Sequence, residues 1–177
     1  MVSRLLDTII GCAIVLLIGY VPWPGTWRSR SEFGTRVADA ADDVNAYLRV
    51  ALGLEAGERR ALRRHAYRRL SDLRTLLQQA LAEPPLVSRQ AAAWWPVIVA
   101  LERVLDAVTA FAVERDAAAA PGADPADAEQ VARFASGLCD RIRQRQPPET
   151  TLPEEGPLAG IATELRTAAA VVAGPSA

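Results

Sequence analysis

An uncharged apolar run near the start of the chain constrains its fold more than any other feature. Residues 8–23 form sixteen uncharged positions, T-I-I-G-C-A-I-V-L-L-I-G-Y-V-P-W. With the residues just before it, this segment is long enough to cross the ~30 Å hydrocarbon core of a bilayer as one helix. Trp23 and Trp27 lie where the headgroups would begin, as interface anchors do. Pro22 and Pro24 end the helix there because proline lacks the amide hydrogen. We therefore predict an N-terminal transmembrane helix.

Two other interpretations of this segment stay open. A secretory signal peptide would use Arg4 as its positive region, but no A-x-A-like cleavage site follows the run. A buried core helix would also fit, because the strictly uncharged stretch is shorter than the usual ~20 residues. Orientation follows from the arginines, since three lie soon after the run and one lies before it. Those three are Arg28, Arg30 and Arg36. The excess predicts a cytoplasmic location for everything after the span.

Two charged residues, Arg4 and Asp7, stand at the start of the predicted span. They are three positions apart and therefore share one face of a helix. One interpretation is an interfacial ion pair that lets the helix begin among the headgroups. The other is a polar contact with neighbouring membrane helices in a transport pathway, because ionisable groups inside membranes are usually functional. Position alone favours the ion pair.

Beyond the span, apolar residues recur at helical spacing to the end of the chain. The first stripe is Val37, Ala41, Val44, Leu48 and Leu52, and Gly53 and Gly57 follow it. The second is Leu62, Ala66, Leu70, Leu73, Leu77 and Leu81. The third is Trp94, Ile98, Leu101, Leu105, Val108 and Ala112. The fourth is Val131, Phe134, Leu138 and Ile142, and a weaker last one is Ile161, Leu165 and Ala169. No segment alternates as a strand does, so the sequence predicts an all-α fold with a cytosolic antiparallel bundle of four to five helices.

Prolines and capping residues set the expected helix boundaries. Pro84 ends the second helix, because the residue before a proline is pushed out of helical geometry. Ser88 is the expected N-cap of the third helix, and Pro96 inside that helix predicts a kink, with a true start near residue 95 as the alternative. Asp124 caps the fourth helix, with Pro125 at its first position.

Three regions follow from these patterns. Residues 1–27 form the transmembrane helix and its flank, 28–146 the cytosolic bundle, and 147–177 a proline-rich linker with a weak C-terminal helix. The net charge of −1 argues against nucleic acid as a partner. The charge is uneven, however, because residues 28–74 hold eleven arginines against seven acids. The basic part of the bundle is therefore the part next to the predicted span in sequence.

A run of arginines lies along the second predicted helix. Its members are Arg59, Arg60, Arg63, Arg64, Arg68 and Arg69. Their spacing makes a broad basic face, which we interpret as solvated and paired with three aspartates of the first helix. Those are Asp39, Asp42 and Asp43. The alternative is contact with anionic lipid headgroups, where each arginine adds about 1 kcal/mol. The lipid-facing candidates are Arg59, Arg60, Arg63 and Arg64.

The sequence shows no constellation of catalytic residues. His65 is the one histidine, so no second imidazole exists to complete a metal site or a relay. Cys12 and Cys139 give neither a disulfide framework nor metal-ligand spacing. No glycine-rich phosphate loop and no nucleophile elbow are present. We therefore expect no enzymatic activity, no cofactor and no metal.

Several motifs resemble one transporter family. They are R-L-L-D-T-I-I-G at 4–11, V-P-W-P at 21–24, L-R-R-H-A-Y-R-R-L-S-D-L-R at 62–74, L-A-E-P at 81–84 and A-W-W-P-V-I-V-A-L-E-R-V at 93–104. In this order they resemble the last membrane helix and following cytosolic helices of the fusaric-acid-resistance-like (FUSC, aromatic acid exporter) family.

This resemblance implies export of small organic, often aromatic, acids by an oligomeric transporter of the bacterial inner membrane. Arg4 and Asp7 match the polar start of the family's membrane helix. Family members carry several membrane helices before this region, so we expect a C-terminal piece that is not competent alone. Its partners would be membrane lipids and either other transmembrane helices or further copies, and the organic acid would bind only in a complete assembly. The alternative is a stand-alone, single-pass, membrane-anchored helical interaction module.

Overall fold

The computed structural model describes residues 2–20, 24–82, 85–117, 123–144 and 152–173, and within these ranges all regular structure is helical. The all-α prediction is confirmed for this part of the chain. The helices are α1 (Val2–Tyr20), α2 (Pro24–Leu52), α3 (Arg59–Leu81), α4 (Pro85–Ala92), α5 (Trp95–Asp116), α6 (Pro125–Gln144) and α7 (Ala159–Ala173).

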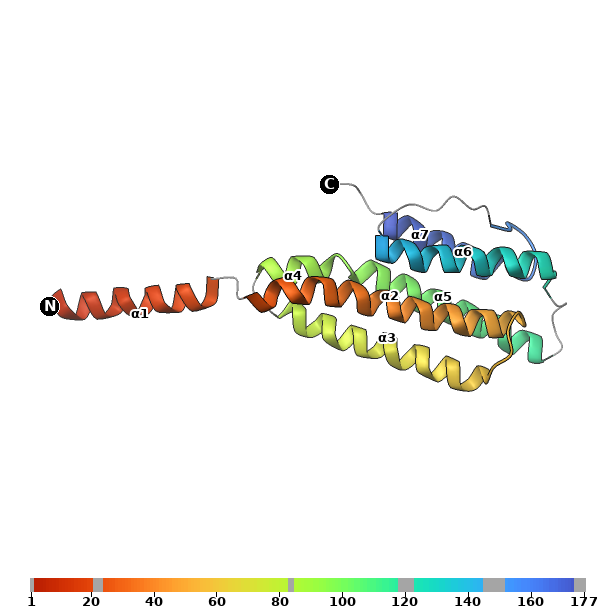
Figure 1. Ribbon diagram of the computed structural model, residues 1–177, viewed down its shortest axis with the longest axis horizontal. Helices are drawn as coiled ribbons and strands as arrows, with labels where there is room; N and C mark the ends of the chain where they lie inside the picture. The colour runs from red at the N-terminus through yellow and green to blue at the C-terminus, as the bar shows by residue number, and fades with distance from the viewer. Residues whose placement is uncertain (1, 21–23, 83–84, 118–122, 145–151, 174–177) are drawn as a thin grey trace.

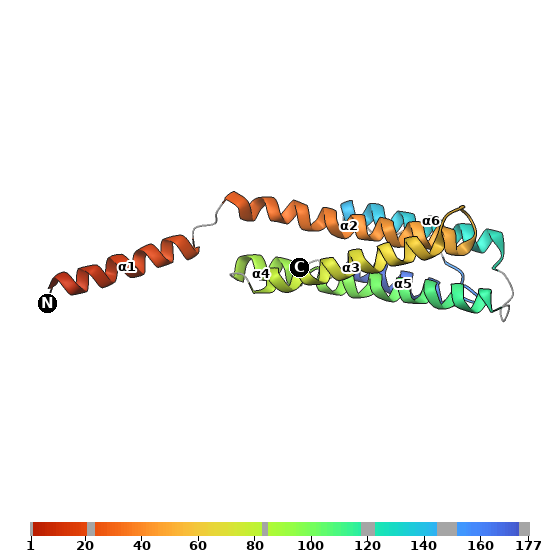
Figure 2. The same cartoon turned by 90° about the horizontal axis from the view of Figure 1, so that it is seen from below.

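The helices α2, α3 and α5 form one side of an elongated bundle, and α6 and α7 cover the other (Figure 1). Helix α2 runs away from α1, α3 returns and α5 runs away again, in both views (Figures 1 and 2). Helices α6 and α7 both run back towards the α1 end. The α6–α7 pair is therefore parallel, whereas the sequence predicted antiparallel order throughout.

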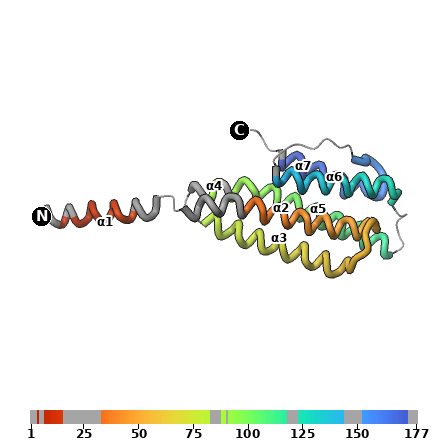
Figure 3. Tube along the Cα trace, viewed as in Figure 1, coloured from red at the N-terminus to blue at the C-terminus, as the bar shows by residue number. Residues whose placement is uncertain are grey.

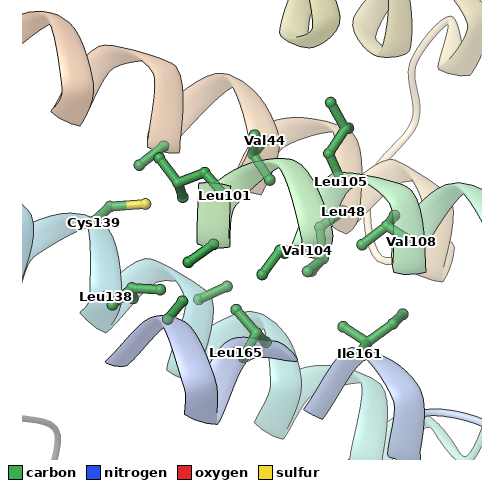
Figure 4. Packing of buried hydrophobic residues seen from close by; sticks show 14 of the residues in the cluster. Val44, Leu48, Leu101, Val104, Leu105, Val108, Leu138, Cys139, Ile161 and Leu165 are labelled. Carbon is green, nitrogen blue, oxygen red and sulfur yellow. The ribbon is translucent and has the colours of Figure 1, made fainter. Parts of the chain in front are cut away.

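Most residues of the predicted apolar stripes are buried, and those of α2, α5, α6 and α7 meet between the helices (Figure 4). Leu81, the last residue of the second stripe, is instead 42% exposed. All five positions of the first stripe are buried, and so are all four of the fourth. The described side chains that are buried are all apolar. Alanines with almost no exposure, such as Ala40, Ala51 and Ala66, let the helix backbones approach closely. Burial of these stripes provides the main stabilisation, as in other helix bundles.

Helix α7 belongs to the same core. Leu158, Ile161 and Leu165 are at most 2% exposed, and α7 packs mainly against α5. The predicted boundary between residues 146 and 147 therefore does not separate the last helix from the bundle. The sequence missed this because a polar, proline-rich connection precedes the helix.

Three of the expected helix boundaries were tested by the structure. Asp124 caps α6 as predicted, since its Oδ1 accepts a hydrogen bond of 2.8 Å from the amide of Ala126. The kink at Pro96 was wrong, and the alternative of a helix start near residue 95 is confirmed: α4 ends at Ala92, and a turn precedes α5, which begins at Trp95. Ser88 consequently lies inside α4 and is not an N-cap. Pro96 occupies the first turn of α5, where its missing amide hydrogen costs nothing.

Helix α1 lies apart from the bundle in every view (Figures 1 to 3). Four of its apolar side chains, Ile9, Ile10, Ile14 and Val15, are between 49% and 70% exposed. Among the described residues, no helix combines the length and the apolar character needed to cross a membrane. The predicted transmembrane helix is therefore not confirmed.

Several residues used in the boundary and orientation predictions lie outside the described part. Pro22, Trp23 and Pro84 are among them. Trp27, Arg28 and Arg30 fall within α2, but the surroundings of their side chains are not described.

Candidate functional site

The two charged residues of α1 are both exposed to solvent. Arg4 and Asp7 form no ion pair with each other among the described residues. The backbone carbonyl of Arg4 accepts a hydrogen bond of 2.8 Å from the hydroxyl of Thr8. The ion pair expected for an interfacial helix start is thus not formed, and both charged side chains remain exposed on the surface of α1.

The four lipid-facing candidates lie together at the beginning of α3. Arg59 is the first residue of that helix, and Arg60, Arg63 and Arg64 follow in its first two turns. This is the end of the bundle farthest from α1 (Figures 1 and 2). Because α2 has 29 residues and each adds about 1.5 Å, roughly 43 Å separates the two ends of α2.

The turn between α2 and α3 is fixed by two glycines. Gly53 has φ +82°, and its amide donates to the carbonyl of Val50 (3.1 Å) while that of Leu54 donates to Arg49 (3.0 Å). This is the Schellman pattern, which requires a left-handed residue that glycine adopts without strain. A Cβ at Gly57 would lie 3.1 Å from Cγ2 of Val50. The close approach holds the start of α3 against the end of α2.

Next to this turn, three helices enclose a hollow of ≈ 220 Å³. Its wall consists of Tyr47 from α2, Arg59, Arg60 and Arg63 from α3, and Ala112, Val113 and Asp116 from α5. We refer to this site as the arginine hollow. The sequence identified its arginines but not the contributions of α2 and α5. Only the packing of the helices brings those residues to the start of α3.

The charges of the arginine hollow are only partly neutralised. The guanidinium of Arg59 donates a hydrogen bond to the carboxylate of Asp116. Behind it, Nη1 of Arg115 donates to the carbonyl of Ala51 at 2.6 Å and so ties α5 to the end of α2. Arg60 and Arg63 have no hydrogen bond or ion pair with any described residue. Arg64 lies outside the hollow, and its Nη2 is 3.9 Å from Oε1 of Glu58.

On the basic face of α3, only one arginine, Arg69, forms an ion pair with an aspartate of α2 among the described residues, so the expected pairing is formed in small part. Asp43 accepts contacts from Nε2 of His65 at 3.3 Å and from Nε of Arg69 at 3.1 Å. Asp42 pairs instead with Arg143 of α6, a partner that the sequence did not indicate. Arg68, which lies outside the hollow, likewise has no hydrogen bond or ion pair with a described residue, so being unpaired is not confined to the arginines of the hollow.

Two further polar groups, Cys139 and Asn45, lie where α2 packs against α6. Cys139 is buried, and this burial, with a smaller contribution from Asp42, raises the pKa of its thiol to about 12. The thiol is therefore protonated and unreactive at neutral pH. Nδ2 of Asn45 donates to Oγ of Ser136 at 3.1 Å, which links α2 to α6. No group of three potential metal-binding side chains occurs in the described ranges.

Comparison of the chain with protein-family models, with curated proteins and with solved structures gave no match. The resemblance to the FUSC family therefore depends on the motifs alone. Three of them fall in the described helices: 4–11 in α1, 62–74 in α3, and 93–104 in the turn before α5 and its first half.

Proposed function

We propose that this chain is a membrane-tethered helical module, in which α1 enters the bacterial inner membrane and the bundle stands in the cytoplasm. The observation that carries the proposal is the exposed apolar surface of α1, where Val15 is 70% and Ile9 60% exposed. In water such a surface is unfavourable by about 25 cal/mol per Å². No described side chain of α1 belongs to the buried core of the bundle. A lipid environment removes this cost.

Subcellular fractionation tests the tether. We expect the full chain in the membrane fraction, resistant to a high-salt wash and released by detergent. Replacing Ile10 and Ile14 with arginine should move the protein to the soluble fraction, because a charge at the centre of a span is costly. The matched control replaces the exposed Val113 of the bundle with arginine and should leave the distribution unchanged. Recovery of the unmodified chain as a detergent-free soluble monomer would contradict the proposal.

A second function, part of a FUSC-like exporter of small organic acids, is favoured by the two charges on α1. Arg4 and Asp7 lie on the same exposed helix as the apolar side chains and find no described partner within the chain. Neighbouring membrane helices, from another polypeptide or another copy, would supply such partners. In this function the bundle supports the assembly and the chain is not competent alone.

Reconstitution distinguishes this function from a simple tether. Cells that express only this chain should show no efflux of an aromatic acid, whereas co-expression with a membrane partner should. Within such an assembly, Asp7→Asn should lower transport more than Arg103→Gln, an exposed charge on the bundle. Equal transport by both variants would leave Asp7 as an ordinary interfacial charge. Efflux by the chain alone would refute the need for partners.

A further inference from the structure

We propose that the arginine hollow binds a small, soluble phosphate monoester through Arg60 and Arg63. The wall of the hollow carries three guanidinium groups and one carboxylate, which leaves an excess of two positive charges. A phosphate monoester near neutral pH carries up to two negative charges. A dianionic ligand therefore balances the excess charge of the wall.

The geometry of the arginines suits this group. Arg60 and Arg63 are three positions apart on α3, so their side chains rise from the same face. Neither is committed to another described residue, while the third, Arg59, is held by Asp116. A planar guanidinium presents paired N–H donors that match the oxygens of a phosphate. The site thus has two guanidinium groups available for a ligand, those of Arg60 and Arg63, beside that of Arg59, which Asp116 holds in place.

The start of α3 supports the same charge preference. Glu58 occupies the N-cap position and makes no side-chain hydrogen bond to the helix. The amide hydrogens of the first turn are consequently not capped by a side-chain oxygen, while the charge of Glu58 already offsets part of the helix dipole. A bound anion can accept hydrogen bonds from these amides. Arg59 and Arg60 belong to that turn, so backbone and side chains act in one direction.

The size and apolar part of the hollow limit the ligand to a small molecule. At ≈ 220 Å³ the site is smaller than the ~300–1,000 Å³ of pockets for drug-sized ligands. Ala112 and Val113 of α5 supply the apolar part of the wall. A phosphate attached to a short organic group fits both the apolar and the basic part of the wall. Its carbon atoms would lie against Ala112 and Val113 of α5, and its oxygens would face the arginines of α3.

A lipid headgroup carries the same phosphate, but the position of the hollow favours a soluble source. This step rests on the proposed tether. With α1 in the membrane, the hollow lies at the other end of α2, roughly 43 Å along that helix. Surface charges are screened within about 10 Å in 0.1 M salt. Lipids of the membrane that holds α1 are therefore out of reach.

Isothermal titration of the detergent-solubilised full chain tests the site. Methyl phosphate should bind saturably, and Arg60→Gln and Arg63→Gln should each weaken binding at least about tenfold. Arg60→Lys keeps the charge but loses the fork and should fall between these values and the native one. The matched controls Arg103→Gln and Arg133→Gln remove one exposed arginine from α5 and α6 and should bind as the native chain does. Circular dichroism verifies that every variant is folded.

Four results would overturn the proposal. The first is the absence of saturable binding by methyl phosphate. The second is equal weakening in the control variants, which would show a general charge effect. The third is binding of succinate as tight as that of methyl phosphate, which would remove the preference for phosphate. The fourth is tighter, Arg60-dependent binding of dihexanoyl phosphatidic acid, which would assign the site to lipid. Because titration does not require insertion of α1, failure of the tether leaves the binding result intact.

Discussion

Replacing Leu105 with alanine tests the packing of the bundle most directly. Leu105 is 0% exposed and lies in the middle of α5, the helix that packs against α2, α3 and α7. The change removes buried carbon atoms equivalent to about 2–3 kcal/mol of transfer free energy. The cavity left behind raises the expected loss to about 3–4 kcal/mol, because the surrounding helices relax only in part.

Urea unfolding of the full chain in mild detergent, followed by far-ultraviolet circular dichroism, measures this loss. Thermal unfolding followed by the same signal should show a Tm about 10 °C lower, because each kcal/mol lowers the Tm of a domain of this size by about 2–4 °C. Leu81→Ala is the matched control: the same substitution, on α3, at a side chain that is 42% exposed. It should change the free energy of unfolding by less than about 0.5 kcal/mol. Similar losses in both variants, or a negligible loss at Leu105, would show that the assigned core is wrong.

Three further predictions concern other parts of the bundle. Ending the chain after residue 146 should make the bundle sensitive to limited proteolysis, because removing α7 uncovers the apolar face of α5; resistance equal to that of the full chain would refute this. Gly53→Ala should destabilise the protein by about 1–2 kcal/mol in urea unfolding because φ is +82°, whereas Gly160→Ala, at a helical position with open space, should be neutral or slightly stabilising. Burial raises the pKa of the Cys139 thiol from 9.0 to about 12, so its stabilising effect is complete below about pH 9 and is lost as the pH rises towards 12. The urea midpoint of the native chain should therefore be lower at about pH 10 than at about pH 8, and this decrease should be smaller in Cys139→Ala. An equal decrease in both proteins would contradict this assignment.

The sequence predicted the helices well because a helical period is a local property. All positions of the first stripe are buried, from Val37 to Leu52, and Asp124 caps α6 as expected. The break before α5 was less predictable. A proline inside an apolar stripe fits either a kink or a new helix, and the hydrogen-bond turn at Ala93 and Trp94 decides in favour of the second.

The candidate site was less accessible to sequence reasoning, for a reason of distance along the chain. The arginines of α3 are visible as a cluster, but Asp116, which holds Arg59, is 57 positions away. Similarly, the adjacency in sequence of the basic segment to α1 suggested lipid contact. The length of α2 instead carries the start of α3 to the opposite end of the bundle. The apolar period of a helix predicts which of its faces is buried. It does not predict where in the fold the segment after the helix will lie.

The pairing of α2 with α6 has a consequence for how the protein is made. Asn45 meets Ser136 across 91 positions, and Asp42 meets Arg143 across 101. At about 5–20 residues per second of synthesis, α2 waits roughly 5–20 s for its neighbour to leave the ribosome. During that interval Val44 and Leu48 lack the covering that α6 provides, and the nascent chain depends on α3 and α5 for partial shelter. Synthesis of the C-terminal third is thus the step that ends the exposure of α2, and agents that stall translation there should increase aggregation or capture by chaperones.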